Sequence, residues 1–152
     1  MLVLAACILT GCGSTAQAKS QLVRATGFSF EAPAGWQVKT AARTASATSK
    51  SQLAEVSTFP LVKRYDDALF AKVARELGLR MREVATQLHG KVTHARTVTV
   101  DGIRSHSYDV TAGGDLLEYT FVLSGKHEFQ LLCRSSGPAE ACVQLLKTFV
   151  TF

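Results

Sequence analysis

The stretch KVTHARTVTVDGIRSHSYDVTAGGDLLEYTFVLSGKHEFQLL, from Lys91 to Leu132, decides the fold. It contains four runs rich in β-branched, aromatic and other apolar residues. The segments that separate these runs all contain glycine: Asp101-Gly102, Gly113-Gly114 and Ser124-Gly125-Lys126. Asp-Gly between two alternating runs is a strong signal of a type I′ hairpin, and Gly-Gly is also typical of a turn. The stretch therefore predicts a four-stranded antiparallel meander.

The last hairpin of this meander is expected to have a three-residue loop, Ser124-Gly125-Lys126. Such a loop pairs Leu123 with His127 and Phe121 with Phe129. It places the apolar residues at alternate positions of both strands on one face. A sheet with one buried face requires this arrangement.

The first hairpin, at Asp101-Gly102, admits two registers. A two-residue loop places His94 opposite Asp109, but it divides the apolar residues between the faces: Val98, Val100 and Ile103 on one, Tyr108 and Val110 on the other. A three-residue loop through Ile103 would instead align Val98 and Val100 with Arg104, His106, Tyr108 and Val110. The sequence leaves this choice open, because a bulge would reconcile either register.

N-terminal to the meander, Tyr65 to His89 has the spacing of an amphipathic helix. Its apolar residues recur at steps of three and four: Phe70, Val73, Leu77, Met81, Val84 and Leu88. Asp66 is the expected N-cap and Gly90 the expected residue after the helix end. Gly78 costs about 1 kcal/mol inside a helix, which makes it the candidate position for a kink or a break.

Further toward the N-terminus, the segment FSFEAPAGWQV from Phe28 to Val38 predicts two short strands around a turn at Pro33-Ala34-Gly35. Ala54 to Leu61 predicts another strand, which ends near Pro60. Between them, Ala41 to Ser51 (AARTASATSKS) is low in hydrophobicity and rich in Ser, Thr and Ala. We expect this segment to be a long mobile loop.

The N-terminal residues predict a targeting signal. An apolar run from Leu2 to Leu9 ends in Leu9-Thr10-Gly11-Cys12, which resembles the lipobox of bacterial lipoproteins. In that family the Cys thiol receives a diacylglyceryl group, and a signal peptidase cuts just before it. The run is far shorter than the roughly 20 apolar residues that span a bilayer. Signal peptides begin with a basic region, but no Lys or Arg precedes Cys12. A start codon upstream of Met1 would explain this.

The resemblance implies that residues 1–11 are a cleaved signal peptide and that Cys12 is lipidated. Residues 12–21 would be a flexible tether, and residues 22–152 the domain. The alternative is a buried N-terminal strand or helix that ends in Gly-Cys.

Cysteine parity points to a disulfide. Of the four cysteines, Cys7 lies in the signal and Cys12 at the lipid site, which leaves Cys133 and Cys142. A pair at this spacing in an exported protein most simply forms a disulfide, worth about 3 kcal/mol on the chain-entropy model. Free core thiols and a redox pair are the alternatives, although the C-x-x-C motif of redox sites is absent.

The C-terminal segment, from Pro138 onward, predicts a helix. Its core-facing residues fall at i, i+3, i+4 and i+7: Cys142, Leu145, Leu146 and Phe149. Because Cys133 ends the last strand of the meander, a disulfide to Cys142 would link this helix covalently to the sheet.

The segment FSFEAPAGW, from Phe28 to Trp36, resembles the strand-Pro-x-Gly-Trp opening of PsbP-like domains. The downstream order of a helix, Val98-Thr99-Val100-Asp101-Gly102, a meander and a C-terminal helix is also similar. Many bacterial members of that superfamily are small lipoproteins, including the LpqN-type proteins of actinobacteria. The resemblance implies a single α+β domain with an antiparallel sheet flanked by helices, and it brings no shared catalytic motif.

The formal net charge is +5, and the basic residues concentrate in and before the long helix: Lys63, Arg64, Lys72, Arg75, Arg80 and Arg82. On a lipid-anchored protein such a surface would favour anionic headgroups or an acidic wall polymer. The alternative is a solvated helix face. We expect no nucleic acid partner, because no basic motif is interleaved with aromatic residues.

Motifs of known enzyme classes are absent: the sequence has no G-x-S-x-G, H-E-x-x-H, Walker A or Rossmann fingerprint. No nucleophile or metal-ligand spacing accompanies the four histidines. We therefore expect no cofactor, no metal and no enzyme activity. A competing hypothesis is an envelope hydrolase that uses His94 or His106 with Asp109, which a deep polar pocket would favour and exposed imidazoles would disfavour.

The sequence thus predicts a lipid-anchored, extracytoplasmic binding module at the outer face of a bacterial cell membrane. Its candidate binding residues are Lys72, Arg75, Arg82 and Trp36, with the segment Ala41 to Ser51 as a further surface candidate. The expected partner is an envelope protein or a lipid or other small ligand. A lipid carrier would require an apolar cavity beneath the long helix.

Overall fold

The computed structural model describes residues 20–137 and 140–152. The predicted signal peptide, the lipidation site Cys12 and Pro138 lie outside these residues. The described residues form a single α+β domain.

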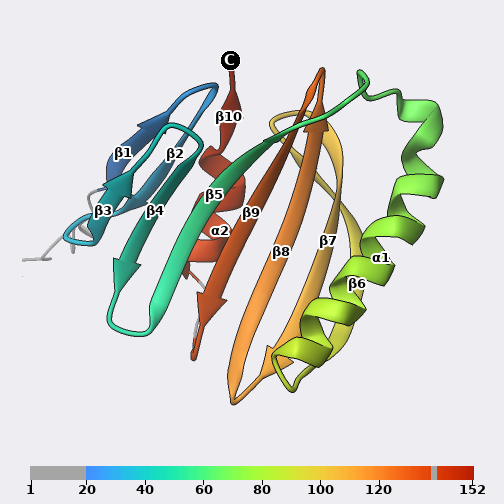
Figure 1. The fold of residues 1–152 in the computed structure, drawn as a ribbon. Coiled ribbons are helices and arrows are strands. Elements are labelled where there is room, and N and C mark those ends of the chain that lie inside the picture. Colours follow the sequence, from blue (N-terminus) through green and yellow to red (C-terminus); the bar gives the residue numbers. More distant parts are fainter. Residues whose placement is uncertain (1–19, 138–139) are drawn as a thin grey trace, which may run out of the picture.

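The centre of the domain is a seven-stranded antiparallel sheet (Figure 1). Its strand order is β3-β4-β5-β9-β8-β7-β6, in which the meander β6 to β9 is confirmed. The bounds are β3 Gln37–Thr40, β4 Thr44–Ser49, β5 Gln52–Pro60, β6 Lys91–Val100, β7 Ile103–Ala112, β8 Asp115–Ser124 and β9 His127–Ser135.

Helices and a small second sheet cover the two faces of this central sheet (Figure 1). The second sheet has the order β1-β2-β10. Its strands are β1 Ser20–Ala25, β2 Phe28–Pro33 and β10 Val150–Thr151. The helices are α1 Phe70–Gln87, preceded by a 3-10 turn at Asp67–Leu69, and α2 Glu140–Thr148. α1 lies on one face, and α2 with the small sheet lies on the other.

Two hydrophobic clusters fill the spaces on either side of the central sheet. Beneath α1, Leu77 and Met81 pack against strand residues such as Phe121. On the opposite face, the second cluster includes Val122 together with residues of α2 and the small sheet. Phe121 and Val122 are neighbours in β8 and both are 0% exposed. Adjacent side chains in a strand point to opposite faces, so this sheet is buried on both.

The first hairpin of the meander has the two-residue loop. Val100 pairs with Ile103, and His94 lies opposite Asp109. Asp101 and Gly102 both have positive φ, 51° and 72°, as a type I′ turn requires. A bulge between Val92 and His94 then shifts the register of the remaining strand. The apolar residues of this hairpin are divided between the two faces of the sheet, as the two-residue loop predicts. Each face has its own hydrophobic cluster.

The predicted three-residue loop at residues 124–126 is wrong. Ser124 pairs with His127 and Leu123 with Glu128, which leaves a two-residue turn that begins at Gly125. Gly125 has a φ of 58°. The prediction failed because it assumed one buried face. With both faces buried, apolar residues need not line up on one side.

The predicted loop from Ala41 to Ser51 is also wrong, because most of it forms β4. This strand pairs with β3 on one side and β5 on the other. Ala45 and Ala47 are fully buried, while Ser and Thr side chains alternate with them. The pattern is that of a half-buried strand, but small side chains give it a low hydropathy.

Helix α1 runs without a break through Gly78. The Asp66 side chain accepts the N–H of Ala68 at 2.9 Å, so it caps the 3-10 turn that leads into the helix. At the other end, His89 and not Gly90 adopts the left-handed conformation, with a φ of 53°. The N–H of Gly90 donates to the carbonyl of Ala85 at 2.8 Å, which closes a Schellman motif.

Gly90 has a different structural role. A Cβ at this position would clash with the Thr111 carbonyl and lie 2.8 Å from the Cβ of Ala112. The chain therefore needs glycine here because it passes close to the end of β7. A Cβ added at Gly78, by contrast, would meet nothing nearer than an Arg82 guanidinium nitrogen at 3.7 Å.

The Cys133–Cys142 disulfide is confirmed and joins β9 to α2, with a Cα–Cα distance of 5.5 Å. Cys142, Leu145 and Phe149 face the core, as the helical spacing predicts, and Leu146 packs against it.

Two short features at the termini were not predicted. After α2, β10 pairs with β2, and the N–H and hydroxyl of Thr151 both donate to Asp101 Oδ2, at 2.8 and 2.9 Å. At the other end, Ser20 and Gln21, the last residues of the expected tether, belong to β1 and pair with β2. Within the described residues, neither helix is long and apolar enough to cross a membrane.

Alanine substitution of the two glycines at α1 should change the free energy of unfolding in opposite directions. Gly78→Ala should raise the free energy of unfolding by about 1 kcal/mol, because a helix interior favours alanine and the site has room. Gly90→Ala should lower it by about 1–3 kcal/mol, because the added methyl group meets the β7 backbone. Urea unfolding of both variants measures the difference, and a Gly90→Ala protein as stable as the parent would contradict the close approach.

Candidate functional site

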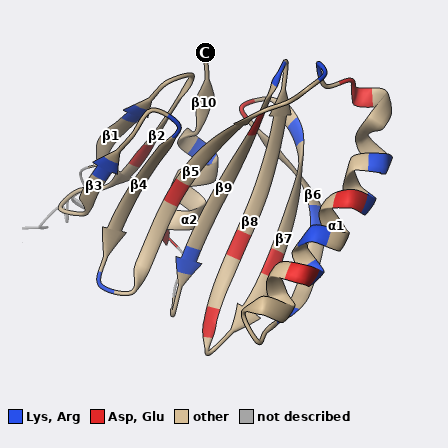
Figure 2. Cartoon of the chain, viewed as in Figure 1, with Lys and Arg blue, Asp and Glu red and all other residues tan. Residues whose placement is uncertain are grey.

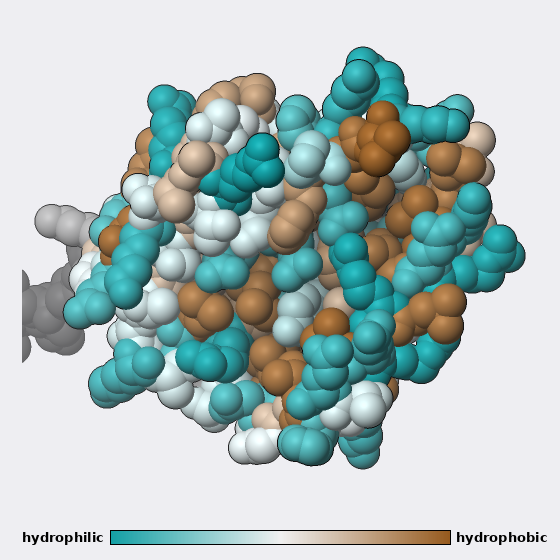
Figure 3. Space-filling view, in the orientation of Figure 1, coloured by the Kyte–Doolittle hydropathy of each residue, from teal (hydrophilic) through white to brown (hydrophobic). Residues whose placement is uncertain are grey.

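The outer face of α1 presents three of the four candidate binding residues. Lys72, Arg75 and Arg82 are exposed and fall with Leu79 at i, i+3, i+7 and i+10, so one helix stripe carries all four. Leu79 is 62% exposed. Figure 2 marks basic residues along α1 with acidic ones between them, and Figure 3 shows apolar surface among the hydrophilic side chains on this side of the molecule.

A groove separates this stripe from the neighbouring strand β6. Its volume is about 520 Å³, and it is lined by Ala74, Arg75, Gly78, Leu79, Arg82, Ala95 and Tyr108. Tyr108 is anchored by its hydroxyl, which donates to the Ala74 carbonyl at 2.9 Å. The small residues at positions 74, 78 and 95 leave the space open. We call Lys72, Arg75, Leu79, Arg82 and Ala95 the α1–β6 surface.

Strand β6 is an edge of the central sheet, and in the described part of the chain no strand pairs with its outer side. Most of its ten residues are exposed. An edge strand offers a row of unpaired N–H and C=O groups, onto which an extended segment of another chain can add. A second hollow, lined by Arg82, Ala85, Thr86 and residues 90–95, continues the groove along this edge.

The basic residues of this surface differ in how they are paired. Lys72 lies 3.9 Å from Glu76, with both side chains about two-thirds exposed. Among the described residues, Arg75 and Arg82 have no carboxylate within 4.0 Å. On the other flank of α1, Arg80 donates to Glu128 Oε1 at 2.6 Å and lies over the Phe121 ring. Arg80 therefore stabilises the fold, whereas Arg75 and Arg82 remain available.

Trp36, the fourth candidate, lies elsewhere. It is half-buried and packs against the cluster on the face of the sheet opposite α1. The Gln21 amide donates to its carbonyl at 2.8 Å, which ties β1 to the start of β3. The structure therefore does not bring Trp36 together with the basic residues.

A charged cluster spans β6, β7 and β8. Arg96 donates to Asp109 Oδ2 and to Glu118 Oε1, both at 2.7 Å. The hydrogen bond to Asp109 is the main cause that raises the pKa of Arg96 above its ordinary value. His94 Nδ1 lies 3.4 Å from the same Asp109 oxygen. This cluster joins the edge strand to its neighbours just beyond the bulge.

The geometry of this cluster differs from that of the hypothesised hydrolase site. The His94 side chain is 74% exposed, and Asp109 Oδ2 is already engaged by Arg96. Within the network, the Ser107 hydroxyl is fully buried and donates to Glu118, and the Thr93 hydroxyl donates to the Asp109 carbonyl. In the described part of the chain these residues form a surface ion-pair network beside an open hollow that His94 lines.

His106 lies on the other face of β7, beneath the start of α1. Its ring stacks on Phe70 with 3.9 Å between centroids, and the Arg104 guanidinium lies 3.9 Å from the same Phe70 ring. His106 is 4% exposed, and its Nε2 has no partner among the described residues. Burial is the main cause that lowers its pKa. Because residues 106 and 109 point to opposite faces of β7, His106 and Asp109 cannot share a site.

The sequence did not predict Leu79 and Ala95 as parts of the α1–β6 surface, or Tyr108 as part of the groove beside it. The spacing of Leu79 from Lys72, Arg75 and Arg82 could have identified it, since all four lie on one helix stripe. Ala95 and Tyr108 come from strands and join the surface only through tertiary packing. The described residues contain no group of three or more His, Cys, Asp or Glu side chains that could hold a metal ion.

A search of solved structures finds a similar fold. The solution structure of cyanobacterial PsbP (CyanoP) from Synechocystis sp. PCC 6803 is similar with a TM-score of 0.63. The sequences are 14% identical, over 95% of this chain and 99% of that one. A crystal structure from Bacteroides thetaiotaomicron VPI-5482 gives a TM-score of 0.48 and 12% identity, over 90% of this chain and 49% of that one. No protein-family model and no curated protein sequence matches.

The similarity to CyanoP confirms the PsbP-like α+β fold that the segment from Phe28 to Trp36 suggested. At 14% identity the similarity concerns the fold alone. The function must therefore be argued from the surfaces of this chain.

The buried imidazole of His106 predicts a pH-dependent stability. Since burial lowers its pKa in the folded state, the unfolded chain binds the proton more readily. Stability should be greatest above the unfolded pKa of about 6.5 and should fall as the pH drops below it, by at most about 1.4 kcal/mol per pH unit. Urea unfolding at pH 7.5 and at pH 5 measures this loss.

The matched variants are His106→Leu and His89→Asn. His106→Leu should lose part of the pH dependence, whereas His89→Asn, at an exposed position, should retain it. An unchanged pH dependence in His106→Leu would exclude this imidazole as a source of the effect.

Proposed function

We propose that this chain is a lipid-anchored, exported binding module at the outer face of a bacterial cell membrane. In this proposal the α1–β6 surface holds an extended, acidic segment of another envelope protein. The observation that carries it is the exposed Leu79 between two unpaired arginines, beside a groove and a free strand edge in the described part of the chain.

Anchoring is supported by the sequence Leu9-Thr10-Gly11-Cys12. Two acyl chains on Cys12 would suffice for stable attachment, at about 0.8 kcal/mol per buried methylene. The disulfide between Cys133 and Cys142 suits an exported protein, because disulfides persist in oxidising compartments.

The chemistry of the surface supports the choice of partner. An extended segment could pair with the backbone of β6 and place its side chains along the groove toward α1. Carboxylates on that segment would meet Arg75 and Arg82, and an apolar side chain would cover Leu79. Arginine is enriched at interfaces because its planar guanidinium binds carboxylates through two hydrogen bonds.

Two other candidate functions are less well supported by the packing. A lipid carrier needs an apolar cavity under α1, but Leu77, Met81 and Ala85 pack directly against the sheet residues there. A hydrolase needs an accessible nucleophile next to a base, whereas the Ser107 hydroxyl is buried beneath the Arg96 cluster.

The anchor is tested by acyl labelling in a bacterial host that processes lipoproteins. Cys12→Ser should abolish incorporation of a labelled fatty acid and leave an unprocessed chain, because the acceptor thiol is gone. Cys7→Ser is the matched control and should be labelled like the parent. Equal labelling of Cys12→Ser and the parent would refute the anchor.

The docking surface is tested by photocrosslinking in the native membrane. A crosslinking residue in place of Leu79 should give a discrete protein adduct, and Arg75→Glu with Arg82→Glu should remove most of it by reversing the charge. Lys39→Glu with Lys50→Glu, both exposed and distant from α1, should leave the adduct intact.

Position Leu22, 65% exposed on β1, serves as the control for the crosslinker itself. The same adducts from positions 79 and 22, or an adduct indifferent to the arginine reversals, would show that the α1–β6 surface is not the docking site.

A further inference from the structure

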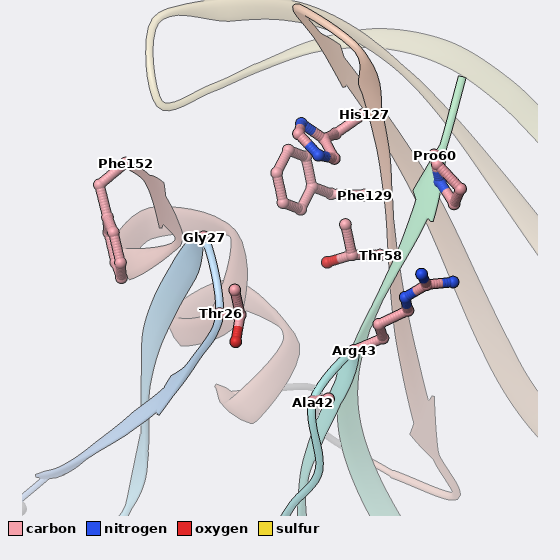
Figure 4. Close-up of a pocket in the computed structure, with 9 residues that line it drawn as sticks. All are labelled: Thr26, Gly27, Ala42, Arg43, Thr58, Pro60, His127, Phe129 and Phe152. Carbon is pink, nitrogen blue, oxygen red and sulfur yellow. The ribbon is translucent and has the colours of Figure 1, made fainter. Parts of the chain in front are cut away.

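A separate cavity of about 370 Å³ lies on the face of the central sheet opposite α1 (Figure 4). It is enclosed by the β1–β2 turn, the β3–β4 turn, the C-terminal residue Phe152 and the adjoining ends of β5 and β9. Its lining residues are Thr26, Gly27, Ala42, Arg43, Thr58, Pro60, His127, Phe129 and Phe152. Its volume is within the range of cavities that hold small molecules.

The apolar walls of this cavity are held in place by the core. Phe129 is 4% exposed and belongs to an aromatic group with Phe28 and Phe149, at centroid distances of 6.1 and 5.6 Å. Phe152 forms another wall, and its N–H donates to the Gly27 carbonyl at 3.1 Å. Two aromatic rings from different elements therefore face the same space, as Figure 4 shows.

The cation that lines the cavity is Arg43. Arg43 is exposed, and its side chain runs past Thr58 toward Pro60 (Figure 4). Among the described residues no carboxylate lies within 4.0 Å of Arg43, and no Asp or Glu side chain lines the cavity. A second cation, Arg24, lies over the Phe152 ring at 5.1 Å.

The Thr58 hydroxyl gives an independent indication of a ligand. Its Oγ1 is buried and has no hydrogen-bond partner among the described residues. Leaving a buried hydroxyl unpaired costs about 1–3 kcal/mol, so buried polar groups in proteins are nearly always satisfied. The Thr58 backbone is already engaged, because its N–H donates to the Arg43 carbonyl at 2.8 Å. The side chain alone lacks a partner, and it projects from β5 toward the β1–β2 turn (Figure 4).

From these observations we propose that this cavity binds a small carboxylate with an aromatic or short alkyl body. The apolar body lies against Phe129 and Phe152, and the carboxylate pairs with Arg43. It accepts a hydrogen bond from the Thr58 hydroxyl, which must rotate from its buried position toward the cavity to donate it. The site is independent of the α1–β6 surface, since the central sheet separates them.

The test uses the 152-residue chain carrying Cys12→Ser, titrated with benzoate and with octanoate and followed by two-dimensional amide NMR. Chemical-shift changes should concentrate at Gly27, Thr58, His127 and Phe152. Benzyl alcohol, which has a similar ring and no charge, should bind at least several-fold more weakly. A preference for benzoate or for octanoate distinguishes an aromatic from an alkyl ligand.

Three variants, each made in this chain, give the proposal its controls. Arg43→Gln should weaken benzoate or octanoate binding about 3- to 10-fold, as loss of a partly exposed charge-assisted contact does. Thr58→Val should also weaken binding, yet it should stabilise the free protein, because it removes the unpaired hydroxyl. Lys39→Gln removes an exposed cation on β3 outside the cavity and should bind like the parent.

Several results would overturn the proposal. These are shift changes spread over the surface, equal binding of benzoate and benzyl alcohol, or an equal effect of Arg43→Gln and Lys39→Gln. Absence of binding by both carboxylates at millimolar concentration would also exclude the site. Because Arg43 and Lys39 are exposed, neither variant is expected to disturb the fold.

Discussion

The burial of both faces of the central sheet is the constraint on which the rest of the structure depends. In β8, Phe121 packs beneath α1 while its neighbour Val122 packs toward α2 and the small sheet. A one-residue slip in any pairing would exchange the two sets of side chains, and each set matches only its own cluster. The two clusters therefore fix one register between them, and the disulfide from β9 to α2 holds the second layer against it.

The same constraint explains which predictions succeeded. Asp101-Gly102 and the period of α1 are local signals, so the meander and the long helix followed from the sequence. The register at Gly125 did not, because an argument from one buried face does not apply to a sheet with two. Strand β4 was missed because Ala45 and Ala47 bury little surface, and β10 because two residues show no alternation. At the candidate site, the helix period placed the basic residues together, but the groove beside them required the tertiary packing of β6.

Most of the charged and titratable side chains near the sheet stabilise the fold. Arg96 joins two carboxylates across three strands, and Arg80 pairs with Glu128. His106 is buried beneath Phe70, where a neutral imidazole is favoured over a charged one. Arg75 and Arg82 differ from these groups, because neither is part of a described ion pair and both border a groove. Arg43 shares that property at the cavity on the opposite face, but in the α1–β6 surface two such arginines flank an exposed leucine.

The position of β1 bears on what this surface could meet. If Cys12 carries the acyl chains, Ser20 follows it eight positions later, and an extended chain of that length spans at most about 28 Å. β1 belongs to the small sheet, at the opposite side of the domain from α1 (Figure 1). Such a tether would keep the start of β1 within this distance of the bilayer, and α1 and β6 lie on the far side of the domain from β1. With β1 nearest the anchor, the basic residues of α1 would be the more distant from the headgroups, which favours an acidic protein segment over a lipid surface as the occupant.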